Sequence, residues 1–400
     1  MKSELVSFLQ TNQKPIQKRN FGIDIARIIS MLCIINLHLI YHGGLLFGAK
    51  ILTIKYNLFL FFVTIFSSGV DIFGMISGFV GFHSHKFSNL IYLLFETFLY
   101  NFGIAYAFKK YHHNYVKELS VYLYPVLISN YWYFNAYFIM YFFLPLINSG
   151  INSMEIKEMG IFILSIFFFF SCFNQIRHYS NRLKMDFFCF AGGFRYMWLL
   201  ILYFYGGYLG RFFQTIHNYN KCFLFLLCCF ISLFSALLRS LIIIYKIKNY
   251  KNDDIMIGEY TSPSSVIISI CFLIIFSKLD IKSNYIKKLF SFFSPLTFGV
   301  YLIHNHVLVR NILIKNNYTF LLNYSSFVSI LLEIIQSLKI FIICSFIDYL
   351  RFLLFKILKI RYICIISLIH QLYFFFKKFI TYIIFFYFIF FCLKVIIFQS

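Results

Sequence analysis

Long apolar runs separated by short polar stretches make up most of the chain. A helix needs about 20 mainly apolar residues to cross a bilayer, and ten runs approach or exceed that length. We expect about ten transmembrane helices, near 22–41, 57–82, 88–108, 122–148, 160–174, 195–213, 222–244, 262–278, 290–311 and 326–347, and the fourth includes a wet or interfacial lead-in. Because no linker, repeat or polar domain interrupts them, the pattern predicts an all-α polytopic integral membrane protein with one membrane domain at 21–347.

The two ends of the chain differ from this core. Residues 1–20 are polar and basic and lack the small-residue cleavage site of a signal peptide, which predicts a cytoplasmic N-terminal segment. The stretch 348–361, DYLRFLLFKILKIR, is basic and amphipathic, which predicts a helix lying on the cytoplasmic surface. Residues 362–400 form a hydrophobic C-terminal extension with room for one or two more spans.

Composition supports a membrane protein and argues against a nucleic-acid-binding protein and against a disulfide- or metal-stabilised one. Hydrophobic residues make up 61% of the chain and charged residues only 12%. The net charge of +22 comes from short runs of Lys and Arg between apolar segments, so we expect the lipid bilayer as partner and no nucleic acid. The 10 Cys contain no CxxC pair and lie mostly in apolar segments, so we expect neither a disulfide framework nor a metal site.

The first predicted span, which contains DIARIISMLCIINLH, carries three ionisable residues that are costly in a membrane. Asp24, Arg27 and His38 follow one helix face, and the last two lie roughly 16 Å apart along the axis. In one interpretation, Asp24 and Arg27 form an interfacial ion pair and His38 lies at the opposite headgroup level. In the other, the Arg holds phosphate and the His moves a proton inside the bundle. The residue types alone leave both interpretations open.

Three further stretches carry weaker signals. GVDIFGMISGFVGF at 69–82 has small residues that allow close helix approach. YWYFNAYFIMYFFLPLIN at 131–148 begins with aromatic residues that suit a membrane interface. SPLTFGVYLIHNHVLVR at 294–310 places His304 in an otherwise apolar span. Each stretch alone is compatible with ordinary packing.

Taken together, these stretches resemble the membrane-bound acyltransferase-3 family, which includes the O-acetyltransferases of bacterial surface polysaccharides. The motifs occur in the family's order over roughly residues 19–351. They are Arg27 followed by ten residues and His38, ISGF at 76–79, WYFNAY at 132–137 with LPLIN behind it, and FGVYLIH at 298–304. Two features depart from the family. Phe73 and Gly74 stand where many relatives have an aromatic pair, and the tail after Tyr362 lies outside the family core.

The resemblance implies a ten-helix core that takes an acyl group from acyl-CoA in the cytoplasm and places it on a glycan hydroxyl at the outer side. It implies His38 as the catalytic residue. The substrate- or acyl-CoA-binding residues would be Arg27, Asp24, Ser77, Gly78, Trp132, Tyr137, Tyr301 and His304. We expect acetyl-CoA as the acyl donor and no metal. The acceptor would be a glycan or lipid-linked oligosaccharide of a capsule, O-antigen or exopolysaccharide, and the location the bacterial inner (cytoplasmic) membrane.

The residue types fit this chemistry, because an alcohol attacks a thioester well only when a base removes its proton. Direct transfer with His38 as base and a relay through an acyl-histidine both remain open. The alternative is a transporter, flippase or polymerase for lipid-linked sugars. Such proteins would normally place key polar groups in several spans or large external loops, whereas this chain concentrates them in the first span. The glycan, the nature of the acyl group and the oligomeric state are not specified by the sequence.

Overall fold

The computed structural model describes residues 19–83, 86–111, 116, 118–126, 131–175, 188, 190–213, 220–248 and 260–361. Every regular element in these ranges is helical, and eight helical segments are long and apolar enough to cross a membrane. The chain is therefore an all-α polytopic membrane protein, as the hydrophobic pattern predicts. The expected N-terminal segment before Arg19 and the hydrophobic extension at 362–400 lie outside the described residues.

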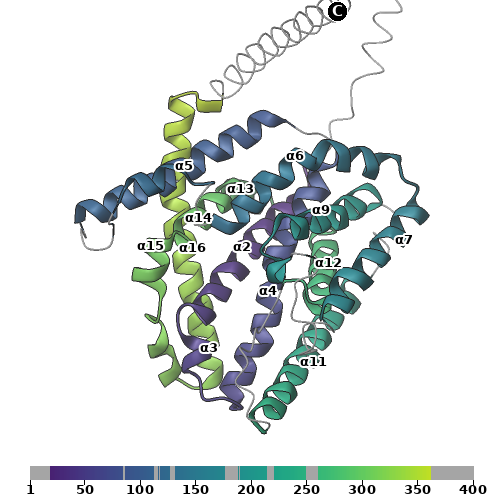
Figure 1. Ribbon diagram of the computed structural model, residues 1–400, viewed down its shortest axis with the longest axis vertical. Coiled ribbons are helices and arrows are strands. Elements are labelled where there is room, and N and C mark those ends of the chain that lie inside the picture. Colours follow the sequence, from purple (N-terminus) through teal and green to yellow (C-terminus); the bar gives the residue numbers. More distant parts are fainter. Residues whose placement is uncertain are drawn as a thin grey trace, which may run out of the picture.

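The main helices follow the predicted spans in order along the chain (Figure 1). They are α2 (Phe21–Tyr41), α3 (Leu45–Gly48), α4 (Ile54–Gly81), α5 (Phe87–Tyr111), α6 (Trp132–Ser153), α7 (Ile156–Ile166) with its π-helical continuation η4 (Phe167–Phe173), α9 (Tyr196–Arg211), α11 (Lys221–Lys248), α12 (Pro263–Ser277), α13 (Asn284–Phe293), α14 (Thr297–His304), α15 (Val307–Val309) and α16 (Ser326–Ile357). Short 3-10 segments include η2 (Ser120–Leu123) and η6 (Ser294–Leu296).

Four predicted spans differ in detail from the observed helices. Helices α9 and α12 have 16 and 15 residues, so each is shorter than an ordinary spanning helix. The expected span 122–148 begins at Trp132, since η2 forms a separate short turn. The expected span 290–311 is divided into short helices, since α13 ends at Phe293, η6 contains Pro295 and α14 ends at His304.

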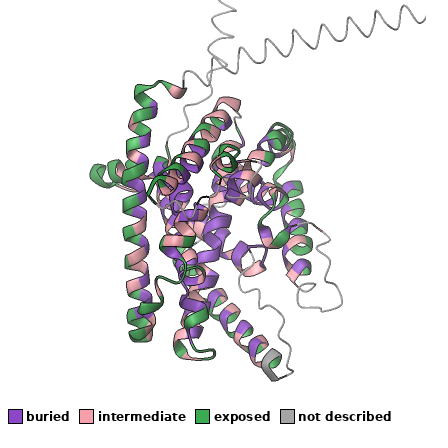
Figure 2. Ribbon diagram, turned by 60° about the vertical axis from the view of Figure 1, so that its left-hand side comes forward, coloured by how far each residue is buried: buried purple, intermediate pink, exposed green. Residues whose placement is uncertain are grey.

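Helices α2 and α4 form the centre of the bundle. Helix α4 packs against α2, α9, α11 and α12, and α2 also packs against α12, α14 and α16. Figure 1 shows α16 along one edge of this pair and α7 and α11 along the other. Figure 2 shows buried residues gathered in the interior and exposed ones on the outer helices. The exposed residues include many large apolar ones, such as Phe230. Such a distribution suits a bundle surrounded by lipid.

Small residues allow α4 and α9 to approach closely. A Cβ atom added at Gly78 would overlap the carbonyl oxygen of Tyr203, and one at Gly206 would overlap the carbonyl oxygen of Met75. Neither position accepts a side chain without displacing backbone. The small-residue run in α4 therefore acts as a packing motif. Gly78 lies in this helix–helix contact, and its predicted part in substrate binding stays a prediction.

Helix α16 continues without a break to Ile357, so it includes most of the predicted surface segment at 348–361. Asp348 is fully buried and accepts a hydrogen bond from Tyr100 Oη of α5 at 2.7 Å. Arg351 donates to both Asp348 oxygens at 2.9 and 2.8 Å, and its NH2 lies 3.1 Å from Glu96 Oε1. These partners on α5 satisfy the buried polar residues near the end of α16.

Candidate active site

The start of α2 is fixed by its cap and by α12. Asn20 accepts a hydrogen bond from the backbone N–H of Gly22 at 2.9 Å through its side chain, as an N-cap residue does. The Asn20 side-chain amide also donates to the carbonyl of Ser277, at the end of α12, at 2.9 Å. This double contact sets the depth and rotation of α2, and therefore the direction of its polar face.

Asp24 is buried and takes its closest partners from outside the predicted pair. Arg19 Nε donates to Asp24 Oδ2 at 2.8 Å, and Ser294 Oγ donates to Asp24 Oδ1 at 2.8 Å. Arg27 NH1 lies 3.6 Å from Asp24 Oδ1, which is an ion pair without a hydrogen bond. The Arg27 side chain keeps 32% of its surface exposed. Its guanidinium therefore has donors available for a ligand.

Arg27 lines two adjoining cavities. The first, which we call the cation cavity, has a volume of about 360 Å³ and is lined by residues including Arg19, Asp24, Arg27, Val80 and Phe213. The second, which we call the middle cavity, has a volume of about 280 Å³. Its lining includes Arg27, Phe73, Ser77, Val80, Tyr137 and Tyr203. Arg27 and Val80 belong to both linings, so the two cavities lie on either side of the Arg27 side chain.

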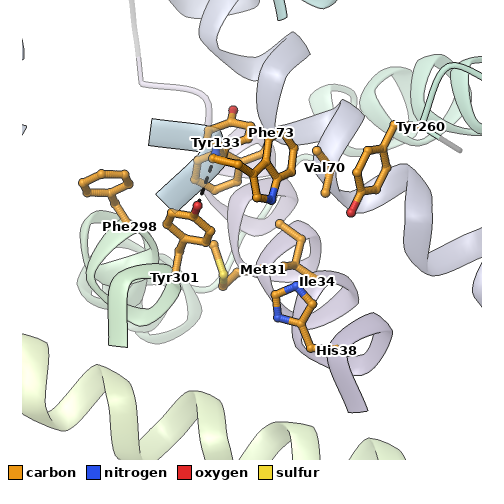
Figure 3. A pocket seen from close by; sticks show the side chains of 10 residues that line it. Met31, Ile34, His38, Val70, Phe73, Tyr133, Tyr260, Phe298 and Tyr301 are labelled. Atoms are coloured by element: carbon orange, nitrogen blue, oxygen red, sulfur yellow. Dashed lines mark hydrogen bonds between the residues drawn. The ribbon is translucent and has the colours of Figure 1, made fainter. Parts of the chain in front are cut away.

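His38 lines a third, much smaller space, which we call the histidine pocket (Figure 3). Its volume of about 20 Å³ holds little more than one water molecule. The lining comprises Met31, Ile34, His38, Val70, Phe73, Trp132, Tyr133, Tyr260, Phe298 and Tyr301. Phe73 also lines the middle cavity, so the Phe73 side chain lies between the space that contains Arg27 and the space that contains His38.

The aromatic walls of the histidine pocket come from four parts of the chain. Tyr301 Oη in α14 accepts a hydrogen bond from the backbone N–H of Tyr133 in α6 at 3.3 Å (Figure 3). Trp132 stacks on Tyr260, with ring centroids 5.7 Å apart and 17° between the planes. Phe73 of α4 meets the ring of Tyr133 edge-on. These contacts enclose His38 in mainly apolar surroundings.

His38 contacts a second histidine across the bundle. Its Nδ1 atom lies 3.1 Å from His304 Nε2. The other ring nitrogen of His304 lies 2.6 Å from the carbonyl oxygen of Val300, one turn earlier in α14. His304 is fully buried, whereas His38 is half-buried at the edge of its pocket. Helix packing thus joins two imidazoles that are 266 residues apart in the sequence.

The structure places the sequence-predicted residues in three groups. Arg27 and Asp24 line the cation cavity, and Ser77 and Tyr137 line the middle cavity with Arg27. The histidine pocket contains His38, Trp132 and Tyr301, with His304 behind His38. Gly78 lines none of these three cavities and lies in the contact between α4 and α9.

Sequence reasoning gave no site role to four aromatic residues that line the histidine pocket: Phe73, Tyr133, Tyr260 and Phe298. In the sequence, Phe73 stood out only as a departure from the family pattern. Tyr260 gave no signal, because its stacking on Trp132 depends on the packing of distant segments.

Asp71 does not line the histidine pocket but fixes the helix that forms one of its walls. It is fully buried and accepts hydrogen bonds from Trp198 Nε1 at 3.1 Å and Ser265 Oγ at 2.6 Å. These bonds join α4, α9 and α12. Because Asp71 follows Val70 of the histidine pocket, the same contacts hold this wall in position. Asp71 therefore has a structural role that its isolated position in the sequence does not reveal.

No group of three or more His, Cys, Asp or Glu is arranged to hold a metal ion in the part of the chain that the structure describes. The groups available for a ligand are instead cations at one end of the site and imidazoles at the other. This arrangement suits an anionic ligand that reaches a proton-transfer group.

A family model described as an acyltransferase domain matches residues 20–347. The chain thus belongs to the acyltransferase-3 family of membrane acyltransferases. Searches of curated proteins and of solved structures gave no match. The matched range begins at the cap of α2 and ends within α16, so it contains His38, His304 and every residue that lines the three cavities except Arg19.

Proposed function

We propose that the protein transfers an acetyl group from acetyl-CoA to a hydroxyl of a bacterial cell-surface glycan, and that it acts in the inner membrane. One observation carries the proposal. Arg27, with donors available for an anion, and His38, a half-buried imidazole, line spaces that meet at Phe73. A donor bound through its phosphates at one end can present its thioester at the other. Family membership disfavours the alternative of a sugar transporter or polymerase.

Coenzyme A would bind through its phosphates at the cation cavity. Asp24 is already paired with Arg19, so the charge of Arg27 is not fully cancelled. A guanidinium can hold a phosphate through two parallel hydrogen bonds, which a single ammonium group cannot do. Because Arg27 also lines the middle cavity, the pantetheine arm can pass along this side chain past Ser77 and Tyr137.

The thioester would react beside His38. His38 removes the proton of the acceptor hydroxyl as its oxygen bonds to the acetyl carbon. The carbon–sulfur bond then breaks, and His38 returns the proton to the departing thiolate of coenzyme A. The small size of the histidine pocket favours a short acyl group such as acetyl over longer ones. The Phe73 ring must move when the donor arm enters, because it lines the boundary between the two spaces.

The direct test compares the surface glycan of cells with wild-type protein and with His38→Ala. We expect NMR spectra of the purified glycan to lose their O-acetyl signals in the variant, at equal amounts of membrane protein. His83→Ala is the matched control, since His83 is exposed after the end of α4. Full acetylation with His38→Ala, or a glycan without acetyl groups in the wild type, would overturn the proposal.

A further inference from the structure

The contact between His38 and His304 has a chemical direction, because each imidazole nitrogen either donates or accepts a hydrogen bond. Val300 presents a carbonyl oxygen, which can only accept. His304 Nδ1, at 2.6 Å, therefore carries the hydrogen. In a neutral imidazole the other nitrogen then has a lone pair and no hydrogen. His304 Nε2 is thus an acceptor.

The same logic extends to His38. Its Nδ1 atom, 3.1 Å from the acceptor His304 Nε2, must supply the hydrogen of that contact. Nε2 of His38 then keeps its lone pair and is the nitrogen that can take a proton. The carbonyl of Val300 thereby determines, through two rings, which nitrogen of His38 is basic.

We propose that His304 is a positioning residue, which holds His38 in the tautomer with its hydrogen on Nδ1 and leaves Nε2 as the base. This inference rests on the proposed function, in which His38 takes the proton of the acceptor hydroxyl. His304 does not touch the reacting atoms. It also orients the His38 ring, since the hydrogen bond fixes the ring's rotation about its side chain.

The surroundings explain why a neutral imidazole suits this position. His304 is fully buried, and Asp24, the carboxylate on the same helix as His38, is paired near the other end of that helix. A carboxylate behind His38 would carry a large desolvation cost in an apolar bundle. A neutral imidazole provides the same acceptor without a buried negative charge. When His38 becomes positively charged during proton transfer, it keeps its hydrogen bond to His304.

The tautomer is directly measurable. We would record nitrogen NMR spectra of protein labelled with ¹⁵N-histidine in nanodiscs, and assign His38 by its loss in His38→Gln. We expect the wild-type His38 ring to carry hydrogen on Nδ1 and none on Nε2. In His304→Phe, which has no acceptor, this preference should be lost. In His304→Gln the side-chain oxygen can accept the same hydrogen bond, so the preference should return in part. His83→Gln should leave the His38 signals unchanged.

Kinetics provide the second measurement, on variants that elute as folded protein. His304→Phe should lower kcat by about ten- to a hundredfold, within the range of general acid–base effects, and change the KM for acetyl-CoA less than about twofold. His304→Gln should recover a substantial part of kcat. A purely structural role of His304 would give equal losses in both variants, and this result would overturn the proposal.

The two measurements separate this inference from the proposed function. Hydrogen on Nε2 of wild-type His38 would overturn the positioning role even in a protein with full acetyltransferase activity. The expected tautomer, together with full activity of His38→Ala, would instead refute the proposed function, while the hydrogen-bond assignment would stand.

Discussion

Phe73 and Tyr133 meet edge to face, with ring centroids 5.9 Å apart, at the boundary between the middle cavity and the histidine pocket. Phe73 is the residue that lines both spaces, and the pocket beyond it has a volume of only about 20 Å³. The ring of Phe73 therefore limits how large an acyl group can lie beside His38. Acyl-chain selectivity becomes a measurable consequence of this geometry.

We predict that Phe73→Ala broadens the range of acyl donors. Removing the ring leaves space for added methylene groups, each of which is worth roughly 1 to 3 kcal/mol of discrimination in an apolar pocket. The ratio of kcat/KM for butyryl-CoA to that for acetyl-CoA should rise at least about tenfold. Thioester consumption by purified protein in nanodiscs measures both values.

Phe61→Ala is the matched control, because Phe61 lies on the same helix but lines an apolar groove against α16. It should leave the ratio unchanged. An unchanged ratio in well-folded Phe73→Ala would mean that Phe73 does not limit the acyl group.

Arg27 gives the second prediction. If its guanidinium holds the phosphates of coenzyme A, Arg27→Ala should weaken acetyl-CoA binding by about ten- to a hundredfold, the cost of a charge-assisted hydrogen bond of roughly 1.5 to 3 kcal/mol. Arg27→Lys should have a smaller effect, since it keeps the charge but loses the planar donor pair. Calorimetric titration of the purified protein with acetyl-CoA measures the affinity.

Two controls accompany the Arg27 variants. Lys221→Ala removes an exposed cation on α11 and should not alter affinity. Asp24→Asn should lower the amount of folded protein instead, because Asp24 joins Arg19 to Ser294. Wild-type affinity in folded Arg27→Ala would contradict a phosphate-binding role and favour the interpretation of Arg27 as a simple ion-pair partner.

The orientation of the bundle gives the third prediction. A basic N-terminal segment before the first span favours a cytoplasmic N-terminus, so the segment between α2 and α4 should face outward and that between α4 and α5 inward. In a background without native Cys, an impermeant maleimide should label Lys50→Cys in intact cells. It should label Lys86→Cys only after permeabilisation. The reverse pattern would place Arg27 on the wrong side for cytoplasmic coenzyme A.

The membrane class and the order of the spans could be predicted because hydrophobicity and length are local properties. Arg27 and His38 could be selected because they share one face of one helix, which sequence spacing reveals. The contact of His38 with His304 could not be predicted, since it depends on how α14 packs against α2. Family motifs placed His304 in the site, but only the hydrogen bond to Val300 indicates what it does.

The partners of Asp348 could not be predicted for a similar reason. Asp348 and Arg351 follow the last apolar run, so the sequence suggests a polar surface beyond the membrane domain. Their partners, Glu96 and Tyr100, belong to a helix about 250 residues earlier, and no local pattern connects the two segments. Buried ion networks between distant helices are therefore the features that a single sequence reveals least.

The contact between α4 and α9 gives the last prediction. Gly78→Ala and Gly206→Ala should each destabilise the protein, because the added methyl group would overlap a carbonyl oxygen of the facing helix. Overpacking of this kind costs about 1 to 3 kcal/mol, or more where backbone must move. Gly103→Ala and Gly150→Ala are matched controls in other helices, where nothing lies within 4 Å of the new Cβ. Alanine there should be neutral or slightly stabilising, since it favours helix. Thermal unfolding in detergent, followed by size-exclusion chromatography, ranks the four variants. Equal melting temperatures across the set would show that α4 and α9 do not depend on this close approach, and the packing role assigned to Gly78 would be wrong.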